Sequence, residues 1–473
     1  MFHHLNRLID MKKIIFIGLT VGALAGCAVG PKYSRPETKK PEAYTQKADS
    51  VATAKTDSIT NMKWWDIYQD TVLQRLMHTA VAKNLDLKIA IARVEESKAI
   101  LGFNQANLFP SFDYAARARA TDFGQSSGEA GVTFPTNSFS ALGSVSWEID
   151  IWGKLRHSSR AAFADLVATD ENRKSLYISL VAQVAELYFQ LRGLDERLTI
   201  TQRTVETRNE YLRIITLRFN QGQVSELDKL QAEQIAESAK AQLYSLERSI
   251  IYTENALNIL LGQSYVPVSR GLLNNQQQLP IDIPSGIPSE LLERRPDIRS
   301  AEQQLVAQTE RVGVAVAMRF PSLSLTGFLG VASPEISTLF QPGAFLGSIT
   351  GQLAGTAFHF RQNKRRVEAE KAVAQQVAFA YEKTVLNAFA EVENSLASIR
   401  TYGNEFGARQ RQVAASEKSL MLSKALYDGG YTSFLQVLDA ERELFNSQFE
   451  KSIVLQNQLI STVQLYKALG GGW

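Results

Sequence analysis

The sequence predicts a membrane protein of the α+β class, with four β-strands and very long helices arranged in two copies of one plan. Two hairpins of alternating apolar and polar residues predict the strands. Two proline-free runs, at 155–219 and 361–427, predict the helices. The sequence around Gly222 recurs around Gly430, and the same offset of 208 carries Gly262 onto Gly470. One polypeptide therefore contains an internal two-fold repeat.

The first residues are typical of an exported lipoprotein. Two lysines at 12–13 precede an apolar run at 14–24, which leads into LAGC ending at Cys27. This charge order and length predict a cleaved secretory signal, since a membrane-spanning helix would need about 20 apolar residues. LAGC resembles the bacterial lipobox, which implies lipidation of Cys27. The residue that follows is Ala28 and not aspartate, which implies delivery to the outer membrane.

The domain organisation follows from composition and from the repeat. Residues 27–62 are rich in Lys, Pro, Thr, Ser and Ala, which predicts a tether along a surface. We expect a signal peptide at 1–26, the lipidated tether at 27–62, a first repeat at 63–262, an equatorial linker at 263–286 and a second repeat at 287–473. Within the repeats we expect strand hairpins at 110–152 and 321–360, and long helical hairpins at 155–262 and 361–470.

Alternation with a period of two marks the strands. From Phe139 to Trp152 one face is apolar or glycine, while the other is mostly serine or acidic. Residues 110–121 behave alike, as do segments of the second half near Ser322 and Ser348. The length of the alternation predicts strands slightly longer than the segments of about 10 residues that are typical of a transmembrane β-barrel. The outer loops are expected near 123–137 and 332–343. Strands that are apolar outside and polar inside also fit such a barrel.

Each long run is expected to form one helix of about 100 Å, at 1.5 Å per residue. Each helix meets a turn in which Gly222 or Gly430 supplies the left-handed conformation that ends a helix. Ser225 and Ser433 are placed to cap the helix that returns. The pattern therefore predicts a coiled coil or a long tube of helices.

Four strands per chain cannot close a membrane barrel, because the smallest barrels have eight. An open sheet edge in lipid would leave backbone groups unpaired, at several kcal/mol each. The protein must therefore assemble from several copies. Two copies would give eight strands with a filled interior, and three would give twelve with room for a lumen.

The composition excludes other functional classes. A net charge of +3 gives no basic excess for binding nucleic acid. The single cysteine excludes disulfides within the chain. The five histidines show no metal-like spacing outside the leader. No nucleophile–base pair or phosphate loop is evident, so we expect no enzyme activity, no cofactor and no metal site.

Several segments together resemble a known family. Ile287 to Gly327 reads IPSELLERRPDIRSAEQQLVAQTERVGVAVAMRFPSLSLTG, and it is supported by WW at 64–65, NLDLKIAIAR at 84–93 and GPKYSRP at 30–36. These segments are similar to outer-membrane efflux lipoproteins of the TolC superfamily, in the branch that serves RND-type multidrug pumps. The resemblance covers essentially the whole mature chain.

The resemblance implies a homotrimer. Its twelve-stranded β-barrel, with four strands per chain, would lie in the outer membrane and continue into a twelve-helix periplasmic α-barrel. The implied partners are a periplasmic adaptor (a membrane fusion protein), an inner-membrane RND-type pump and outer-membrane lipid. The implied function is a passive exit duct for small toxic compounds that the pump delivers through the adaptor.

The second turn carries a charged pattern that the first turn lacks. Leu435, Asp439 and Arg442 are spaced four and three apart, so they share one helix face. At the matching positions of the first half, glutamines replace the two charged residues. In channels of this family these positions face inward at the closed periplasmic end. The resemblance therefore implies a gate, with Leu435 as an apolar constriction and with ion pairs of Asp439 and Arg442 that hold the second helical pairs inward.

Two further sets of residues follow from the turns. The turn residues are expected to form the periplasmic tip and to contact the adaptor: Gly222, Ser225, Gly430 and Ser433. Tyr427 and Asp228, which lie near the two turns, are candidates for a link between the helical pairs.

Two other functions use parts of the same pattern. A type I protein-secretion channel shares the architecture, but such relatives often lack the lipid, so the lipobox and RRPD at 294–297 favour efflux. A non-conducting lipoprotein could brace the envelope as a coiled coil. The alternating strands argue against that second alternative.

Overall fold

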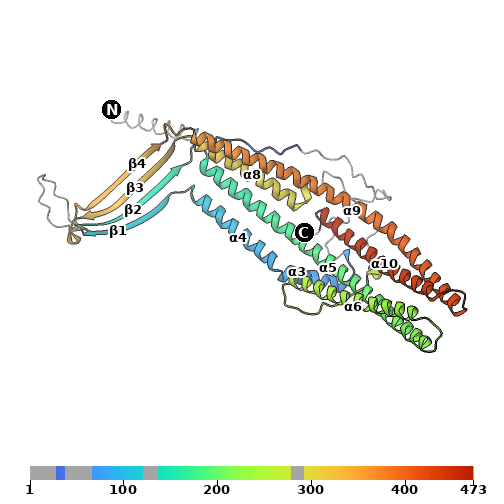
Figure 1. Ribbon diagram of the computed structural model, residues 1–473. Helices are drawn as coiled ribbons and strands as arrows, with labels where there is room; N and C mark the ends of the chain where they lie inside the picture. The colour runs from blue at the N-terminus through green and yellow to red at the C-terminus, as the bar shows by residue number, and fades with distance from the viewer. Residues whose placement is uncertain (1–27, 38–66, 121–136, 278–291, 472–473) are drawn as a thin grey trace. The chain divides into compact units, whose positions relative to one another are not determined.

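The computed structural model of the chain describes residues 28–37, 67–120, 137–277 and 292–471 (Figure 1). The signal peptide, Cys27 and the tryptophan pair at 64–65 lie outside the described residues, as does most of the tether. The chain divides into two compact units. One contains the β-sheet with the adjoining parts of the helices, and the other contains the remaining lengths of the long helices and their turns.

Four antiparallel strands form one sheet in the order β1-β2-β3-β4 (Figure 1). Their bounds are β1 Ser111–Ala120, β2 Asn137–Ile149, β3 Ser322–Ser333 and β4 Phe345–Ala354. The two edge strands, β1 and β4, have 10 residues each and are therefore shorter than expected. Ser111 lies opposite Ser146, and Ser322 lies opposite Ala354. Each edge strand has one side that pairs with no other described strand.

The α-helices follow one scheme in both halves, and Figure 1 shows α6 returning beside α5 and α10 beside α9. Their bounds are α3 Thr71–Lys83, α4 Leu85–Ala106, α5 Lys154–Asn220, α6 Glu226–Leu260, α8 Pro296–Ala317, α9 Gln362–Asp428 and α10 Phe434–Ala468. Short 3₁₀ turns cover Asn274–Gln276 and Ile336–Thr338. The predicted fold class, with four strands per chain and long helical hairpins, is confirmed.

The repeat is reproduced in the bounds of the long helices. The offset that carries Gly222 onto Gly430 also carries α5 onto α9 and α6 onto α10, at both ends of each helix. The helices before the strands keep a different offset, because the same shift would carry the end of α4 at Ala106 onto Val314, whereas α8 ends at Ala317. The difference therefore arises between the start of the strand hairpin and the start of the long helix. Loops in such hairpins tolerate changes in length.

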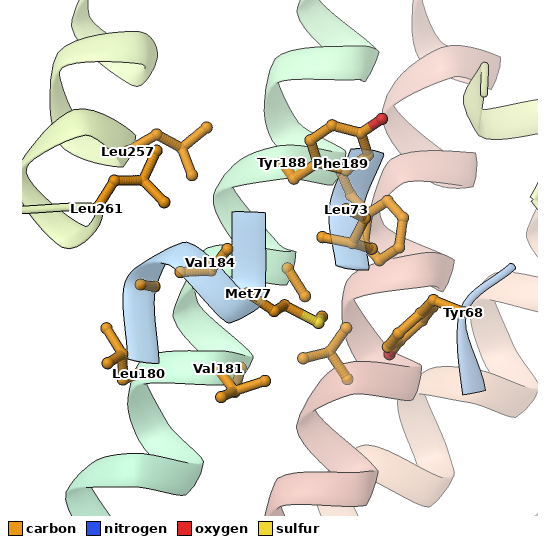
Figure 2. Close-up of a cluster of buried hydrophobic side chains, with 14 of the residues drawn as sticks. Tyr68, Leu73, Met77, Leu180, Val181, Val184, Tyr188, Phe189, Leu257 and Leu261 are labelled. Atoms are coloured by element: carbon orange, nitrogen blue, oxygen red, sulfur yellow. The ribbon is translucent and has the colours of Figure 1, made fainter. Parts of the chain in front are cut away.

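The main core of the helical unit lies where α3, α5, α6 and α10 meet (Figure 2). Leu73 and Met77 of α3 face Val184 and Tyr188 of α5, and all four side chains are almost fully buried. Burying an aliphatic side chain of this size contributes about 1.5–3 kcal/mol. This cluster is the expected result of the three-four apolar spacing in both helices.

A buried carboxylate fixes the linker segment to this core. Asp70 caps α3 by accepting hydrogen bonds from the backbone N–H of Val72 and Leu73. It also accepts from the Tyr188 hydroxyl at 2.6 Å and from the Leu272 N–H at 2.9 Å. Burial alone would raise the pKa of Asp70, but the donated hydrogen bonds outweigh it and hold the pKa below its usual range.

None of the described helices combines the length and the apolar character that a membrane-spanning helix needs.

Candidate functional site

The two helical turns have the same backbone. Gly222 and Gly430 have φ values of +72° and +77°, in the left-handed region. In the first turn Gln223 N–H donates to the Arg218 carbonyl at 2.9 Å, and in the second Tyr431 N–H donates to the Leu426 carbonyl at 2.8 Å. These are the bonds of a glycine-ended helix, so the sequence-based prediction of both turns is confirmed.

The side chains that follow the turns differ. Ser225 accepts from the backbone N–H of Asp228 at 3.2 Å, and the Asp228 carboxylate accepts from the Ser225 N–H at 3.0 Å, which completes a capping box. Ser433 makes no side-chain capping bond, so the expected cap at this position was wrong. The residue three positions on is Gln436, and its amide oxygen accepts from the Thr432 hydroxyl instead.

The three residues predicted as a gate lie on the exposed side of α10. Leu435 is 48% exposed, and the equivalent Leu227 of the first hairpin is 62% exposed. Arg442 Nη2 donates to Asp439 Oδ1 at 2.9 Å, and both side chains are more than half exposed. The ion pair therefore forms within one chain, between residues three apart. The exposed side of Leu435 is not covered by any described part of the same chain.

An apolar cluster lies behind these residues. Ile215 of α5 and Ala232 of α6 pack with Phe434, Val437 and Leu438 of α10. The cluster orients α10, because its buried face fixes which residues point away. A sequence with apolar residues at 434, 437 and 438 places 435, 439 and 442 on the opposite face.

Tyr427 links the two helical hairpins, but not through Asp228. Its hydroxyl accepts from Arg218 Nη1 at 2.9 Å, and the Arg218 guanidinium lies 5.5 Å from the centre of its ring. Asp228 is engaged in the cap of its own helix. Within the described chain, Tyr427 therefore contacts Arg218 of α5 and not Asp228.

Sequence reasoning missed a group of buried charges next to the predicted gate. Glu441 of α10 is 8% exposed, and Arg208 of α5 is 6% exposed. Lys424 Nζ of α9 lies 3.8 Å from Glu441 Oε1. Glu441 Oε2 and Arg208 Nε have no hydrogen-bond partner among the described residues. No periodicity could reveal this group, because it depends on how three separate helices pack.

Glu441 and Lys424 border a cavity of about 400 Å³ between α5, α9 and α10. Burial raises the pKa of Glu441, although the nearby Lys424 and Arg208 act in the opposite direction. Burial also lowers the pKa of Arg208. Buried charges that are only partly paired are unfavourable, so this part of the helical wall is less stable than a fully apolar contact would be.

The described residues contain no group of three or more His, Cys, Asp or Glu side chains that could hold a metal ion. The two turns therefore have the same backbone conformation, but different charged side chains follow them.

The sequence matches the family described as "Outer membrane efflux protein" over residues 76–263 and 287–471. Among curated relatives, the solvent efflux pump outer membrane protein SrpC of Pseudomonas putida is 35% identical, and the match covers 95% of this chain and 96% of SrpC. The cation efflux system protein CusC of Escherichia coli O6:H1 is 29% identical over 95% of this chain and 97% of its own length.

A solved structure agrees with these matches. The open state of the MtrE outer membrane channel of Neisseria gonorrhoeae superposes with a TM-score of 0.84. That structure is 29% identical in sequence, and the superposition covers 94% of this chain and 98% of MtrE. The likeness extends over nearly the whole of both chains.

Proposed function

The chain belongs to the outer membrane efflux protein family, and from that premise we propose that three copies close one channel whose periplasmic end is gated by the second helical turn. The protein is an outer-membrane channel component of an efflux system, with a long periplasmic helical part. Such a component transports and does not catalyse a reaction.

The open sheet carries the proposal for a trimer. β1 and β4 are both edge strands, and each exposes a row of backbone N–H and C=O groups on one side. In lipid those groups must be paired, because each unpaired group costs several kcal/mol. Pairing β4 of one copy with β1 of the next satisfies them, and three copies give a twelve-stranded barrel with a lumen.

The gate is proposed at Leu435, Asp439 and Arg442. A three-fold axis would bring three copies of the uncovered Leu435 together as an apolar constriction. Each exposed ion pair is worth only about 0–1 kcal/mol. The same two charges, re-paired between neighbouring subunits in a confined throat, would hold the channel closed and still let a partner open it.

The proposed partners are a periplasmic adaptor and an inner-membrane pump of the RND type. The turn residues of both hairpins are the proposed adaptor contacts: Gly222, Ser225, Gly430 and Ser433. Lipidation of Cys27 would anchor the chain before the barrel assembles, because several acyl chains at one residue hold a protein stably where one chain does not.

Two measurements on the purified protein test this function. Native mass spectrometry should give three copies per particle, and reconstitution into planar bilayers should give ion conductance. A monomer that stays folded, or a trimer that does not conduct even as the Asp439→Ala/Arg442→Ala variant, would contradict the channel. In the cell, a deletion strain should become more sensitive to some members of a panel of antibiotics, dyes, solvents and metal ions. Complementation with the wild-type gene should restore resistance.

A further inference from the structure

We propose that the junction between the strands and the helices in the second repeat binds the headgroups of anionic phospholipids in the periplasmic leaflet of the outer membrane. This rests on the outer-membrane placement stated above. The junction comprises the end of α8, the residues between β4 and α9, and the first turn of α9. All of it lies within one compact unit.

The two strand–helix junctions of the chain differ in charge. At the first junction, Lys154 and Arg156 pair with Glu148 and Asp150 of the same repeat, and Arg160 lies 4.0 Å from Glu310 of α8. In the second repeat, five cations (Arg319, Arg361, Lys364, Arg365, Arg366) face one carboxylate, Glu368. The first junction therefore sums to zero and the second to +4, since five positive charges less one negative leave four. Only the second junction therefore carries an excess of positive charge that would attract an anion.

These cations are gathered on one surface and most are accessible. Asn363 Nδ2 donates to the Met318 carbonyl at 3.3 Å, which holds the start of α9 against the end of α8. Arg319 is therefore brought next to the basic turn of α9. Its side chain is exposed and forms no hydrogen bond or ion pair with another described residue. The Lys364 and Arg365 side chains are 63% and 71% exposed, although both lie near Glu368.

Exposed aromatic rings stand beside the cations. Phe358 and Phe360 are 74% and 86% exposed, and their ring centres lie 4.7 Å apart in an edge-to-face contact. Phe360 and Arg361 have φ values of +41° and +63°, which are strained for residues other than glycine. The strained turn presents two rings and a guanidinium together. Aromatic rings and basic side chains are the groups that proteins place at the membrane–water boundary.

A cavity of about 220 Å³ adjoins this surface. Trp152 and Phe320 stack in its wall with ring centres 4.6 Å apart, and Arg319 and Asn363 also line it. Two carboxylates also border it: Glu148 pairs with Lys154 at 2.6 Å, and Asp150 pairs with Arg156 at 3.2 Å. The charge in the wall without a partner among the described residues is therefore the Arg319 guanidinium, which can donate two parallel hydrogen bonds to a phosphate.

The location selects a lipid as the source of that phosphate. The junction lies at the ends of the strands that adjoin the helices, which places it at the periplasmic leaflet of the membrane. A phospholipid there would direct its headgroup to Arg319, Arg361 and Lys364, and its acyl chains toward the apolar face of the strands. Phosphatidylglycerol or cardiolipin fits the net charge, while a neutral headgroup does not.

The test compares lipid binding by the purified trimer in detergent. Native mass spectrometry would measure retained phosphatidylglycerol, cardiolipin and phosphatidylcholine. The variant Arg319→Gln/Arg361→Gln/Lys364→Gln should bind the two anionic lipids on the order of 100-fold more weakly, because each basic residue near an anionic surface contributes substantially. The variant Arg319→Lys/Arg361→Lys, which keeps the charge, should retain most of the binding.

A matched control removes three cations elsewhere. Lys98→Gln/Arg213→Gln/Lys240→Gln changes the net charge by the same amount at positions that pair with acids on their own helices. This control should bind anionic lipid as the wild type does. Equal binding by the junction variant, equal loss in the control, or full competition by inorganic phosphate would each overturn the proposal. Bilayer conductance, measured on the same preparations, reports separately on the channel.

Discussion

The two helical hairpins of this chain share a backbone and differ in chemistry. One constant offset relates the bounds of both helices, and both turns use a left-handed glycine with equivalent backbone bonds. The first turn is closed by a capping box, whereas the second has no side-chain cap but carries an exposed ion pair. Few residues are thus needed to keep the backbone of a repeat, so the others are free to diverge.

Two equivalent glutamates of the return helices α6 and α10 also differ in their environment. Glu233 and Glu441 are equivalent in sequence, yet Glu233 is exposed and Glu441 is buried. The cause is the packing of the two return helices, since α10 buries many more of its side chains than α6 does. α10 of the second hairpin packs against α5 near both of its ends. A buried charge on α10, such as that of Glu441, therefore affects the stability of this helix–helix contact.

The largest expected effect comes from removing the two charged residues that only the second hairpin carries. Asp439→Ala with Arg442→Ala removes the charges proposed to pair between neighbouring subunits, and three such pairs would together be worth up to about 3 kcal/mol. The open state should gain up to on the order of 100-fold in population, seen as raised conductance in planar bilayers. The control is Gln231→Ala with Gln234→Ala, at the same positions of the first hairpin, and it should conduct like the wild type. Unchanged conductance in the charge variant would exclude the gate.

The second prediction concerns glycines that end helices. Gly262 and Gly430 both have a positive φ, but a Cβ at Gly262 would overlap the Lys83 carbonyl oxygen, whereas one at Gly430 would meet nothing within 4 Å. Gly262→Ala should therefore lower the free energy of unfolding by about 3 kcal/mol, from strain and overlap together. Gly430→Ala should cost about 1 kcal/mol, from strain alone. Thermal unfolding of both variants would measure this, and equal losses would contradict it.

The third prediction is a pH dependence at Glu441. Burial raises the pKa of Glu441 above its ordinary value of 4.5, so the folded state favours the protonated form. Its contribution to stability is therefore full below about pH 4.5 and is lost as the pH rises through the folded pKa. Glu441→Gln should raise stability at pH 7.5 by about 1–2 kcal/mol, and this gain should vanish near pH 4.

Glu233→Gln is the control for that measurement. The same substitution at the equivalent exposed position should leave the melting temperature unchanged at both pH values. A gain at Glu441 that persisted at pH 4 would show that charge is not the cause, and a loss at neutral pH would show that the carboxylate is needed.

Much of this fold follows from the sequence because it depends on local patterns. Alternation over residues 139–152 predicts β2, and the proline-free runs predict α5 and α9 almost to their ends. The spacing of Leu435, Asp439 and Arg442 places them on one face of a helix, whereas their assignment as a gate rests on the family resemblance and on the uncharged residues of the first half. Each of these signals is contained in a single stretch of chain.

The features that sequence reasoning missed depend on contacts between distant segments. Glu441 is buried because α5 and α9 cover it, and Tyr427 pairs with Arg218 because that side chain reaches across from α5. Ser433 looked like a cap because Ser225 is one. The difference lies three residues later, where the Gln436 amide oxygen accepts from the Thr432 hydroxyl, whereas the Asp228 carboxylate completes the first box. A capping prediction therefore has to include the third helical residue.

The smallest expected effect concerns the different capping of the two turns by Ser225 and Ser433. Ser225→Ala removes a reciprocal cap and should destabilise the first turn of α6 by about 1 kcal/mol. Ser433→Ala removes no capping bond and should change the first turn of α10 by much less. Amide hydrogen exchange is the suitable measurement, because local opening of one helical end need not alter global unfolding. The amide of Asp228, which donates to Ser225 Oγ, should exchange about fivefold faster in the first variant. Equal acceleration at Gln436 in the second variant would mean that both serines act as caps in solution. The two turns would then differ only in the charges of the proposed gate.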